Sequence, residues 1–136
     1  MNGSGYERDR PERLPSAAVT PLPPETRGGL DRKSVRRVVW RHRREVLACY
    51  PVAARQRDVG GLVTLDFTIA LSGEVRAIAL RYQTLGDDQI ARCFVDAVRA
   101  WQFPRPLHGE EAVVAQKFML VPRPGPLPVR PSGGVK

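Results

Sequence analysis

The sequence predicts an α+β domain in which two helices cover one face of a three-stranded antiparallel sheet. Apolar residues recur at intervals of three and four in two segments, which is the period of an amphipathic helix. In a third segment apolar residues alternate along the chain, and a short Ser-Gly turn joins that segment to a second strand-like run. The predicted element order is αββαβ. With the strands numbered along the chain, the predicted sheet order is 2-1-3, so that neighbouring strands are antiparallel.

Proline-rich arms are predicted at both ends of this domain. The chain has 136 residues, a length that allows one domain. Its 13 prolines are concentrated outside the segments that show helix or strand periodicity. Residues 1–29 show no apolar periodicity, and residues 123–136 are similarly rich in proline, so we expect both arms to be disordered. The folded domain is therefore predicted at residues 30–122.

The first helix is predicted from Ser34 to Ala48. Ser34 suits the N-cap, and Pro51 should end the helix because it cannot donate the next backbone hydrogen bond. Trp40 lies off the apolar stripe and is expected to be partly exposed. The stripe consists of Val35, Val38, Val39, His42, Val46, Cys49 and Tyr50.

Two strands are predicted next, from Val63 to Leu71 and from Glu74 to Tyr82. The first shows the two-residue period of a half-buried strand, and the second is weaker in pattern but rich in residues that suit a strand. Because only Ser72 and Gly73 connect them, the two strands should be antiparallel neighbours.

The second helix is predicted to begin after Asp87, which suits an N-cap, with Asp88 at the positive end of the helix dipole. Pro104 prevents its continuation. Trp101 continues the apolar stripe, so we expect it to plug the core where the helix ends; an exposed aromatic platform would require it to leave that stripe. The stripe consists of Ile90, Cys93, Phe94, Ala97, Val98 and Trp101.

Two cysteines lie on these stripes, one on each helix. If both helices pack side by side on one sheet face, Cys49 and Cys93 come close enough for a disulfide, which would be favoured in an oxidising compartment. The alternative is a pair of small buried thiols, which a cytoplasmic location would favour.

The formal net charge of +8 raises the possibility of an anionic partner. Nucleic-acid or anionic-surface binding through the first helix is therefore the alternative function. Nucleic acid is the less favoured partner, because exposed arginines on an amphipathic helix are usually only solvated, and the chain lacks the loop and strand motifs of common RNA-binding domains. The candidate anion-binding residues are Arg36, Arg37, Arg41, Arg43 and Arg44.

No group of residues in the sequence suggests catalysis, a cofactor or a metal. His42 and His108 have neither cysteine nor acidic partners at metal-binding spacing, and the two cysteines are too far apart for a Cys-x-x-Cys motif. Gly60 and Gly61 precede a strand and do not form a phosphate-binding loop. We therefore predict a protein that is not an enzyme.

The ordered motifs of the predicted domain resemble the C-terminal domain of the TonB family, in particular the variant called the AgmX/PglI C-terminal domain. The resemblance rests on the stretches "GLVTLDFTIALSGEVRAIAL" and "LGDDQIARCFVDAVRAWQFPRP", where a strand ends in Ser-Gly and a helix closes in Trp-x-Phe-Pro. Pro51 interrupts a stretch that is usually helical in the family, and the membrane anchor typical of the family is missing from this sequence.

This resemblance implies a periplasmic or cell-envelope interaction module in a transport, energy-transducing or gliding complex, similar to those of myxobacteria. Read as it stands, the chain carries no export signal or membrane anchor, so a cytoplasmic location is an open alternative. Any link to the membrane would run through an anchor upstream of this sequence.

The predicted partner-binding surface is the open edge of the third strand, which could accept an extended peptide by strand addition. The alternatives are a guarded edge without a ligand, a homodimer through this edge, or an edge covered by the proline-rich tail. The strand consists of Val113, Val114, Ala115, Gln116, Lys117, Phe118, Met119, Leu120 and Val121.

Overall fold

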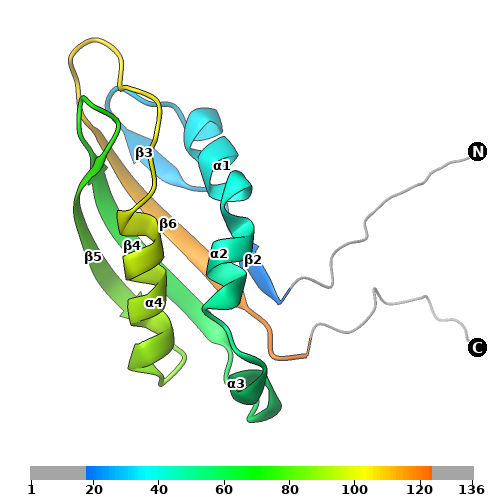
Figure 1. Cartoon of the computed structure of the whole chain (residues 1–136). Helices are drawn as coiled ribbons and strands as arrows, with labels where there is room; N and C mark the ends of the chain where they lie inside the picture. Colours follow the sequence, from blue (N-terminus) through cyan, green and yellow to red (C-terminus); the bar gives the residue numbers. More distant parts are fainter. Residues whose placement is uncertain (1–17, 124–136) are drawn as a thin grey trace, which may run out of the picture.

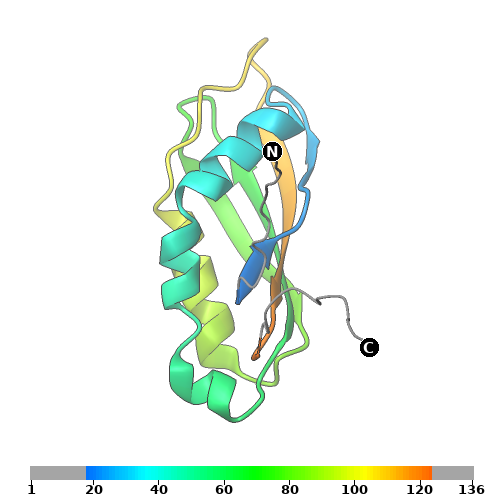
Figure 2. The same cartoon turned by 90° about the vertical axis from the view of Figure 1, so that its right-hand side faces the viewer.

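In the computed structural model, which describes residues 18–123, helices lie over one face of an antiparallel sheet (Figures 1 and 2). Within residues 18–123, the opposite face of the sheet carries no helix (Figure 2). In chain order, the elements are β2 (Val19–Pro21), β3 (Glu25–Arg27), α1 (Arg32–Arg41), α2 (Arg43–Ala48), α3 (Val52–Gln56), β4 (Gly61–Ile69), β5 (Val75–Gln83), α4 (Asp88–Arg99) and β6 (Ala112–Leu120).

The sheet contains five strands and not the predicted three. Its order is β2-β6-β4-β5, with β3 also pairing with β6, and every pair is antiparallel. The three predicted strands are β4, β5 and β6, and β4 lies between the other two as predicted. The two additional strands come from the N-terminal segment, so the predicted domain boundary at residue 30 is wrong. The disorder predicted for residues 1–17 and 124–136 concerns segments outside the described residues.

The predicted first helix is divided into two, followed by a third short helix. α1 ends at Arg41 and α2 begins at Arg43, because the His42 N–H contacts both the Val38 and Val39 carbonyls at 3.2 Å and the backbone tightens there. The N-cap of α1 is Asp31 and not Ser34: the Asp31 carboxylate accepts a hydrogen bond from the Ser34 N–H at 2.8 Å.

Pro51 separates α2 from α3. α2 ends at Ala48, as expected from the proline, but Pro51 also stands at the N-cap position of α3, where a fixed φ is compatible with starting a new helix. The Ala54 N–H then donates to the Pro51 carbonyl at 3.1 Å. The proline therefore ends one helix and supports the start of the next.

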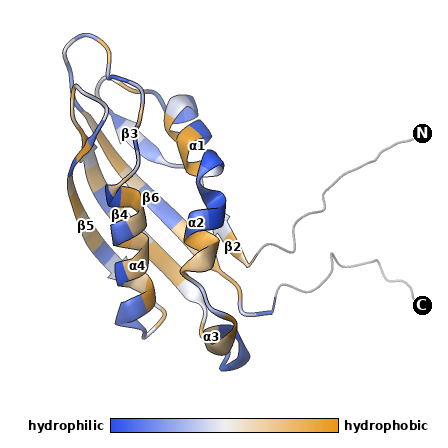
Figure 3. Ribbon diagram, in the orientation of Figure 1, coloured by the Kyte–Doolittle hydropathy of each residue, from blue (hydrophilic) through white to orange (hydrophobic). Residues whose placement is uncertain are grey.

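α4 follows the prediction closely. The Asp87 carboxylate accepts hydrogen bonds from the Gln89 and Ile90 N–H groups at 3.0 and 3.1 Å, which satisfies two donors at the helix start. One side of the helix is buried against the sheet, where the rings of Phe94 and Phe118 lie 5.1 Å apart. Both apolar and hydrophilic residues occur along α1 and α4, as expected for helices that cover one side of a core (Figure 3).

The turn between β4 and β5 contacts the segment that follows α4. Gly73 has a φ of +91°, and its carbonyl accepts a hydrogen bond from the Phe103 N–H at 2.8 Å. The Gln102 side-chain amide donates to the Ser72 carbonyl at 2.9 Å. The Ser-Gly turn and the Trp-x-Phe-Pro segment, which are separate motifs in the sequence, therefore form one corner of the fold.

Candidate partner-binding edge and groove

The edge of β6 that was predicted to be open is occupied by the chain's own N-terminal segment. We call residues 18–27 the strap: β2 pairs with the end of β6 and β3 with its beginning. The Val121 N–H donates to the Ala18 carbonyl at 2.8 Å, and the Leu22 N–H donates to the Lys117 carbonyl at 2.9 Å. The prediction of a free edge is therefore wrong, because main-chain groups on both sides of β6 have partners. The outer edge of β5, in contrast, pairs with no strand of the described residues.

The side chains of β6 alternate between the core and the open sheet face. Buried positions are Ala112, Val114, Gln116, Phe118 and Leu120, and the residues between them are exposed or half-buried: Val113, Ala115, Lys117 and Met119. The observed strand β6 begins and ends one residue earlier than the predicted strand: Ala112 is its first residue, and Val121 follows its end.

Gln116 is the one polar side chain on the buried side of β6. It is 1% exposed, and its amide nitrogen donates to the Leu22 carbonyl at 2.6 Å and to the Lys117 carbonyl at 2.8 Å. It thereby ties the strap to β6 at the point where Pro23 and Pro24 separate β2 from β3. The Gln116 side chain therefore lies on the buried side of β6 and not on its outer edge.

A groove lies between α1 and the strap, next to Gln116. We call it the helix–strap groove; it encloses about 560 Å³. It is lined by Pro21, Leu22, Pro23, Lys33, Arg36, Arg37, Val39, Trp40 and Gln116.

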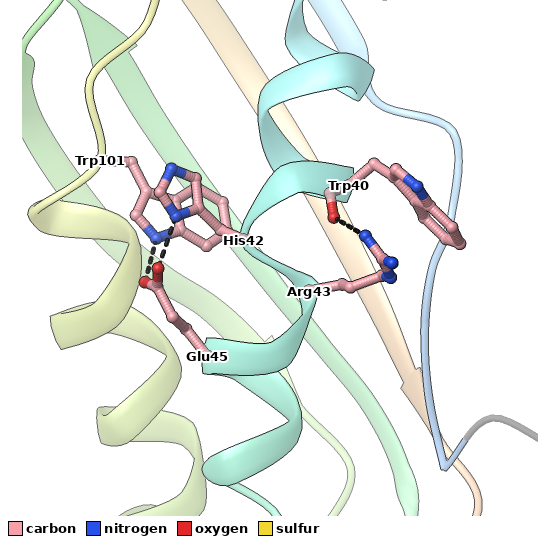
Figure 4. Close-up of polar contacts among 5 residues, drawn as sticks. All are labelled: Trp40, His42, Arg43, Glu45 and Trp101. Atoms are coloured by element: carbon pink, nitrogen blue, oxygen red, sulfur yellow. Dashed lines mark hydrogen bonds and ion pairs between the residues drawn. The ribbon is translucent and has the colours of Figure 1, made fainter.

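The predicted arginine cluster is divided among different surroundings. Arg36 and Arg37 line the helix–strap groove. Arg43 places its guanidinium 4.2 Å from the centre of the Trp40 ring and donates to the Trp40 carbonyl at 2.9 Å (Figure 4). Arg41 and Arg44 are exposed outside the groove. Of the five arginines, Arg36 and Arg37 therefore line the groove directly, and Arg43 contacts it only through Trp40.

Trp101 is a core residue, as predicted, with 3% of its surface exposed. Its indole N–H donates to one oxygen of the Glu45 carboxylate at 2.9 Å, while the other oxygen lies 2.6 Å from His42 Nδ1 (Figure 4). The His42 ring stacks on the indole with the ring centres 4.7 Å apart. These hydrogen bonds lower the pKa of the Glu45 carboxyl, with the bond to His42 contributing most. The cluster fastens the break between α1 and α2 to the end of α4.

The predicted disulfide between Cys49 and Cys93 is present, with the two Cα atoms 5.6 Å apart. It links the C-terminal end of α2 to the middle of α4. Cys49 is buried, but Cys93 is exposed and therefore lies at the border of the α4 stripe and not within it.

His108 and Asp88 belong to different parts of the fold. His108 is in the loop before β6 with a φ of +61°, and Asp88 lies in the first turn of α4, within 3.4 Å of the Gln83 amide. Among residues 18–123, no three histidine, cysteine or acidic side chains gather where they could hold a metal ion. The helices in the same range are all too short or too polar to cross a membrane.

The strap and the groove were not predicted from the sequence. One signal for the strap is the pair Val19 and Thr20, which are β-branched and suit a strand, but the prolines that follow them predict an extended arm more strongly. The signal for the groove is the spacing of Lys33, Arg36 and Arg37, which places all three on one side of a helix.

No family model matches this sequence, and no curated protein does. Among solved structures, the chain is similar to the C-terminal domain of TonB from Pseudomonas aeruginosa, determined by solution NMR. The two are 24% identical, the match covers 52% of this chain and 74% of the other, and the TM-score is 0.42.

Proposed function

We propose that this chain is a non-enzymatic interaction module of the cell envelope, which binds an extended peptide of a partner protein by strand addition at β6. The observation that supports this most directly is the strap: an extended, proline-containing segment already lies antiparallel along the edge of β6. That edge therefore has the geometry that a partner strand requires. A partner would bind there by taking the place of the strap.

The strap is the weaker of the two neighbours of β6. β4 pairs with β6 over nine consecutive residues, whereas β2 and β3 each pair over three. Pro21, Pro23 and Pro24 lack the N–H group that a strand needs for continuous pairing. Displacing the strap from β6 therefore breaks fewer main-chain hydrogen bonds than separating β4 from β6.

The disulfide and the sequence motifs support an envelope location. A bond between Cys49 and Cys93 is maintained in oxidising compartments such as the bacterial periplasm. The resemblance of the motifs to TonB C-terminal domains suggests a place in a transport, energy-transducing or gliding complex. We propose that the partner is an extended segment of another envelope protein.

A substitution in the strap tests this proposal. Leu22→Pro removes the N–H that donates to the Lys117 carbonyl, and Leu22→Ala keeps that donor and serves as the control. Each isotope-labelled protein is titrated with a synthetic peptide of residues 18–27 and with peptides from extended segments of envelope receptors. Backbone amide shifts then report which strand binds.

The proline variant should bind both kinds of peptide more tightly than the alanine variant, with amide shifts along β6. The strap peptide establishes that the edge accepts a strand from another molecule, and the receptor peptides test the envelope function. Receptor peptides that shift only the Arg36 to Arg44 region would instead support the anionic-partner function. If the strap peptide binds and no receptor peptide does, the edge is competent but the envelope function is wrong.

A further inference from the structure

The helix–strap groove is a second candidate binding surface, and it differs from the edge of β6. Three of its lining residues, Pro21, Leu22 and Pro23, belong to the strap, so the groove exists only while the strap is in place. Binding in this groove therefore does not depend on strand addition.

Gln116, which lines the groove, carries a buried hydrogen-bond acceptor that has no partner among residues 18–123. Both donors of the Gln116 amide are used by the carbonyls of Leu22 and Lys117. Its oxygen is buried and accepts no hydrogen bond from the residues that the structure describes. Rotating the amide would place this oxygen against the two carbonyl oxygens, so its orientation is fixed by the strap and β6. A residue that lines the groove thus holds a buried acceptor in a fixed orientation, and no residue between 18 and 123 supplies it with a donor.

Three cations line the same groove as Gln116. Lys33, Arg36 and Arg37 follow one another at the helical spacing that puts side chains on the same side of α1. All three are exposed, and none forms an ion pair with a residue between 18 and 123. Asp31, at the start of α1, is committed to the Ser34 N–H, and the charges of Lys33 and Arg37 add to the lowering of the Asp31 pKa. The groove is therefore positively charged.

The walls of the groove are apolar. Trp40 lies one turn beyond Arg36 and Arg37 and has 60% of its surface exposed, which is unusual for a large aromatic residue. Pro21 and Pro23 form the strap side. Tryptophan and proline surfaces bind extended chains well because they are rigid and lose little conformational entropy on binding.

We propose that the groove binds an acidic, extended segment of a partner protein. Such a segment supplies both things that the groove requires: a main-chain N–H for the Gln116 oxygen, and carboxylates for Lys33, Arg36 and Arg37. The sugar–phosphate backbone of DNA would match the cations but has no N–H to offer the acceptor. For that reason the geometry favours a peptide over a nucleic acid.

The test uses a short blocked peptide rich in glutamate and the same peptide with glutamine in place of each glutamate. Binding to the isotope-labelled full chain at low salt is followed through two side-chain signals, the amide of Gln116 and the indole N–H of Trp40. Only the glutamate peptide should shift both signals. The backbone amides of residues 18–27 should stay hydrogen-bonded to β6, which separates this binding from replacement of the strap.

A charge-matched pair of variants tests the cations. The groove variant combines Lys33→Gln, Arg36→Gln and Arg37→Gln, and all three positions are exposed, so the fold should be unaffected. The control removes the same charge from exposed arginines outside the groove and combines Arg41→Gln, Arg44→Gln and Arg105→Gln. The groove variant should bind the glutamate peptide roughly tenfold more weakly than the control, since each exposed ion pair contributes modestly.

Methylation of single backbone nitrogens in the glutamate peptide tests the acceptor. Methylation of the nitrogen that faces Gln116 should weaken binding about fivefold, the effect of one neutral hydrogen bond, while most other positions should have little effect. Equal weakening at every position would show that no particular N–H is bound.

Two results would overturn the proposal. Equal loss of affinity in the groove variant and the control would show attraction to overall positive charge. A short DNA that shifts Gln116 and Trp40 and displaces the glutamate peptide would assign the groove to nucleic acid. Neither result bears on strand addition at β6, because the strap stays in place in this experiment.

Discussion

Replacing Trp101 with alanine should destabilise the protein by roughly 3–5 kcal/mol. The indole is 3% exposed, and a tryptophan buries on the order of 200 Å² of surface. At about 25 cal/mol per Å², that burial is worth about 5 kcal/mol, of which alanine keeps only the part contributed by its Cβ. The substitution also leaves the Glu45 carboxylate without its indole donor and removes the ring on which His42 stacks.

The same substitution at Trp40 provides the matched control, because that side chain is 60% exposed. Trp40→Ala should change stability by no more than about 0.5 kcal/mol, as is usual at exposed positions. Trp101→Phe separates the ring from its hydrogen bond. It keeps an aromatic ring in the core and loses the donor to Glu45, so it should cost roughly 1–2 kcal/mol.

Urea-induced unfolding, followed by circular dichroism with the disulfide intact, measures all three variants against the natural sequence. The reasoning fails if Trp101→Ala costs less than about 1 kcal/mol, well below the range for large core residues, or if it costs no more than Trp40→Ala. It also fails if Trp101→Phe is as harmful as Trp101→Ala. In that case the hydrogen bond to Glu45, and not burial, would account for the effect of Trp101.

Three further predictions concern the disulfide, the Glu45 carboxylate and the Gly73 turn. Replacing Cys49 and Cys93 together by alanine should cost about 4 kcal/mol in urea unfolding, because the cysteines are separated by 44 residues and the bond restricts the unfolded chain; an unchanged midpoint would contradict this. The pKa of Glu45 is lowered in the folded state, so its stabilising contribution is complete above the unfolded pKa of about 4.3 and is lost as the pH falls through the folded pKa. Because this side chain is half exposed, Glu45→Gln should remove less than about 1 kcal/mol of the acid-dependent stability, measured as unfolding midpoints against pH. Gly73→Ala should cost more than about 1 kcal/mol, since φ is +91° and a Cβ would lie 2.1 Å from the Phe103 carbonyl oxygen; a smaller cost would show that the turn can shift away from Phe103.

The central part of the fold could be predicted because local pattern and tertiary burial agree there. The alternation in β4 corresponds to side chains that point in turn to the core and to the open face, and the Asp87 cap together with the α4 stripe fixes the second helix. The disulfide could be predicted because both helices must cover the same sheet face, which brings Cys49 and Cys93 together. These elements depend on short-range periodicity, which a single sequence shows clearly.

The break in the first helix could not be predicted, because no residue that disrupts helices stands at position 42. His42 fits the helical stripe, and its neighbours on both sides are compatible with one continuous helix. At this break the His42 ring stacks on Trp101 and its Nδ1 contacts the Glu45 carboxylate. Trp101 also donates a hydrogen bond to Glu45, although these two residues are 56 positions apart in the chain. Periodicity reports local preference, and here a distant contact accompanies a departure from it.

The strap escaped prediction for a related reason, since its pairing is specified by β6 and not by its own sequence. Three residues on either side of Leu22 to Pro24 are too few to show a strand period, and the prolines suggest an extended arm. An extended arm and an edge strand have nearly the same backbone conformation, so the two differ only in whether a partner edge lies within reach. The sequence therefore indicates the extended conformation of the strap but not its pairing with β6.

The two proposed binding modes share Gln116, and this sharing determines how they would be coupled. A peptide that replaces the strap removes the Leu22 carbonyl from the Gln116 amide and takes away the strap side of the groove. An acidic segment bound in the groove, in contrast, contacts the strap and Gln116 together and stabilises the arrangement that closes the edge. By thermodynamic linkage each ligand must then weaken the other by the same factor. A single buried glutamine between the strap and the helix face would thus make the two modes of partner binding mutually exclusive.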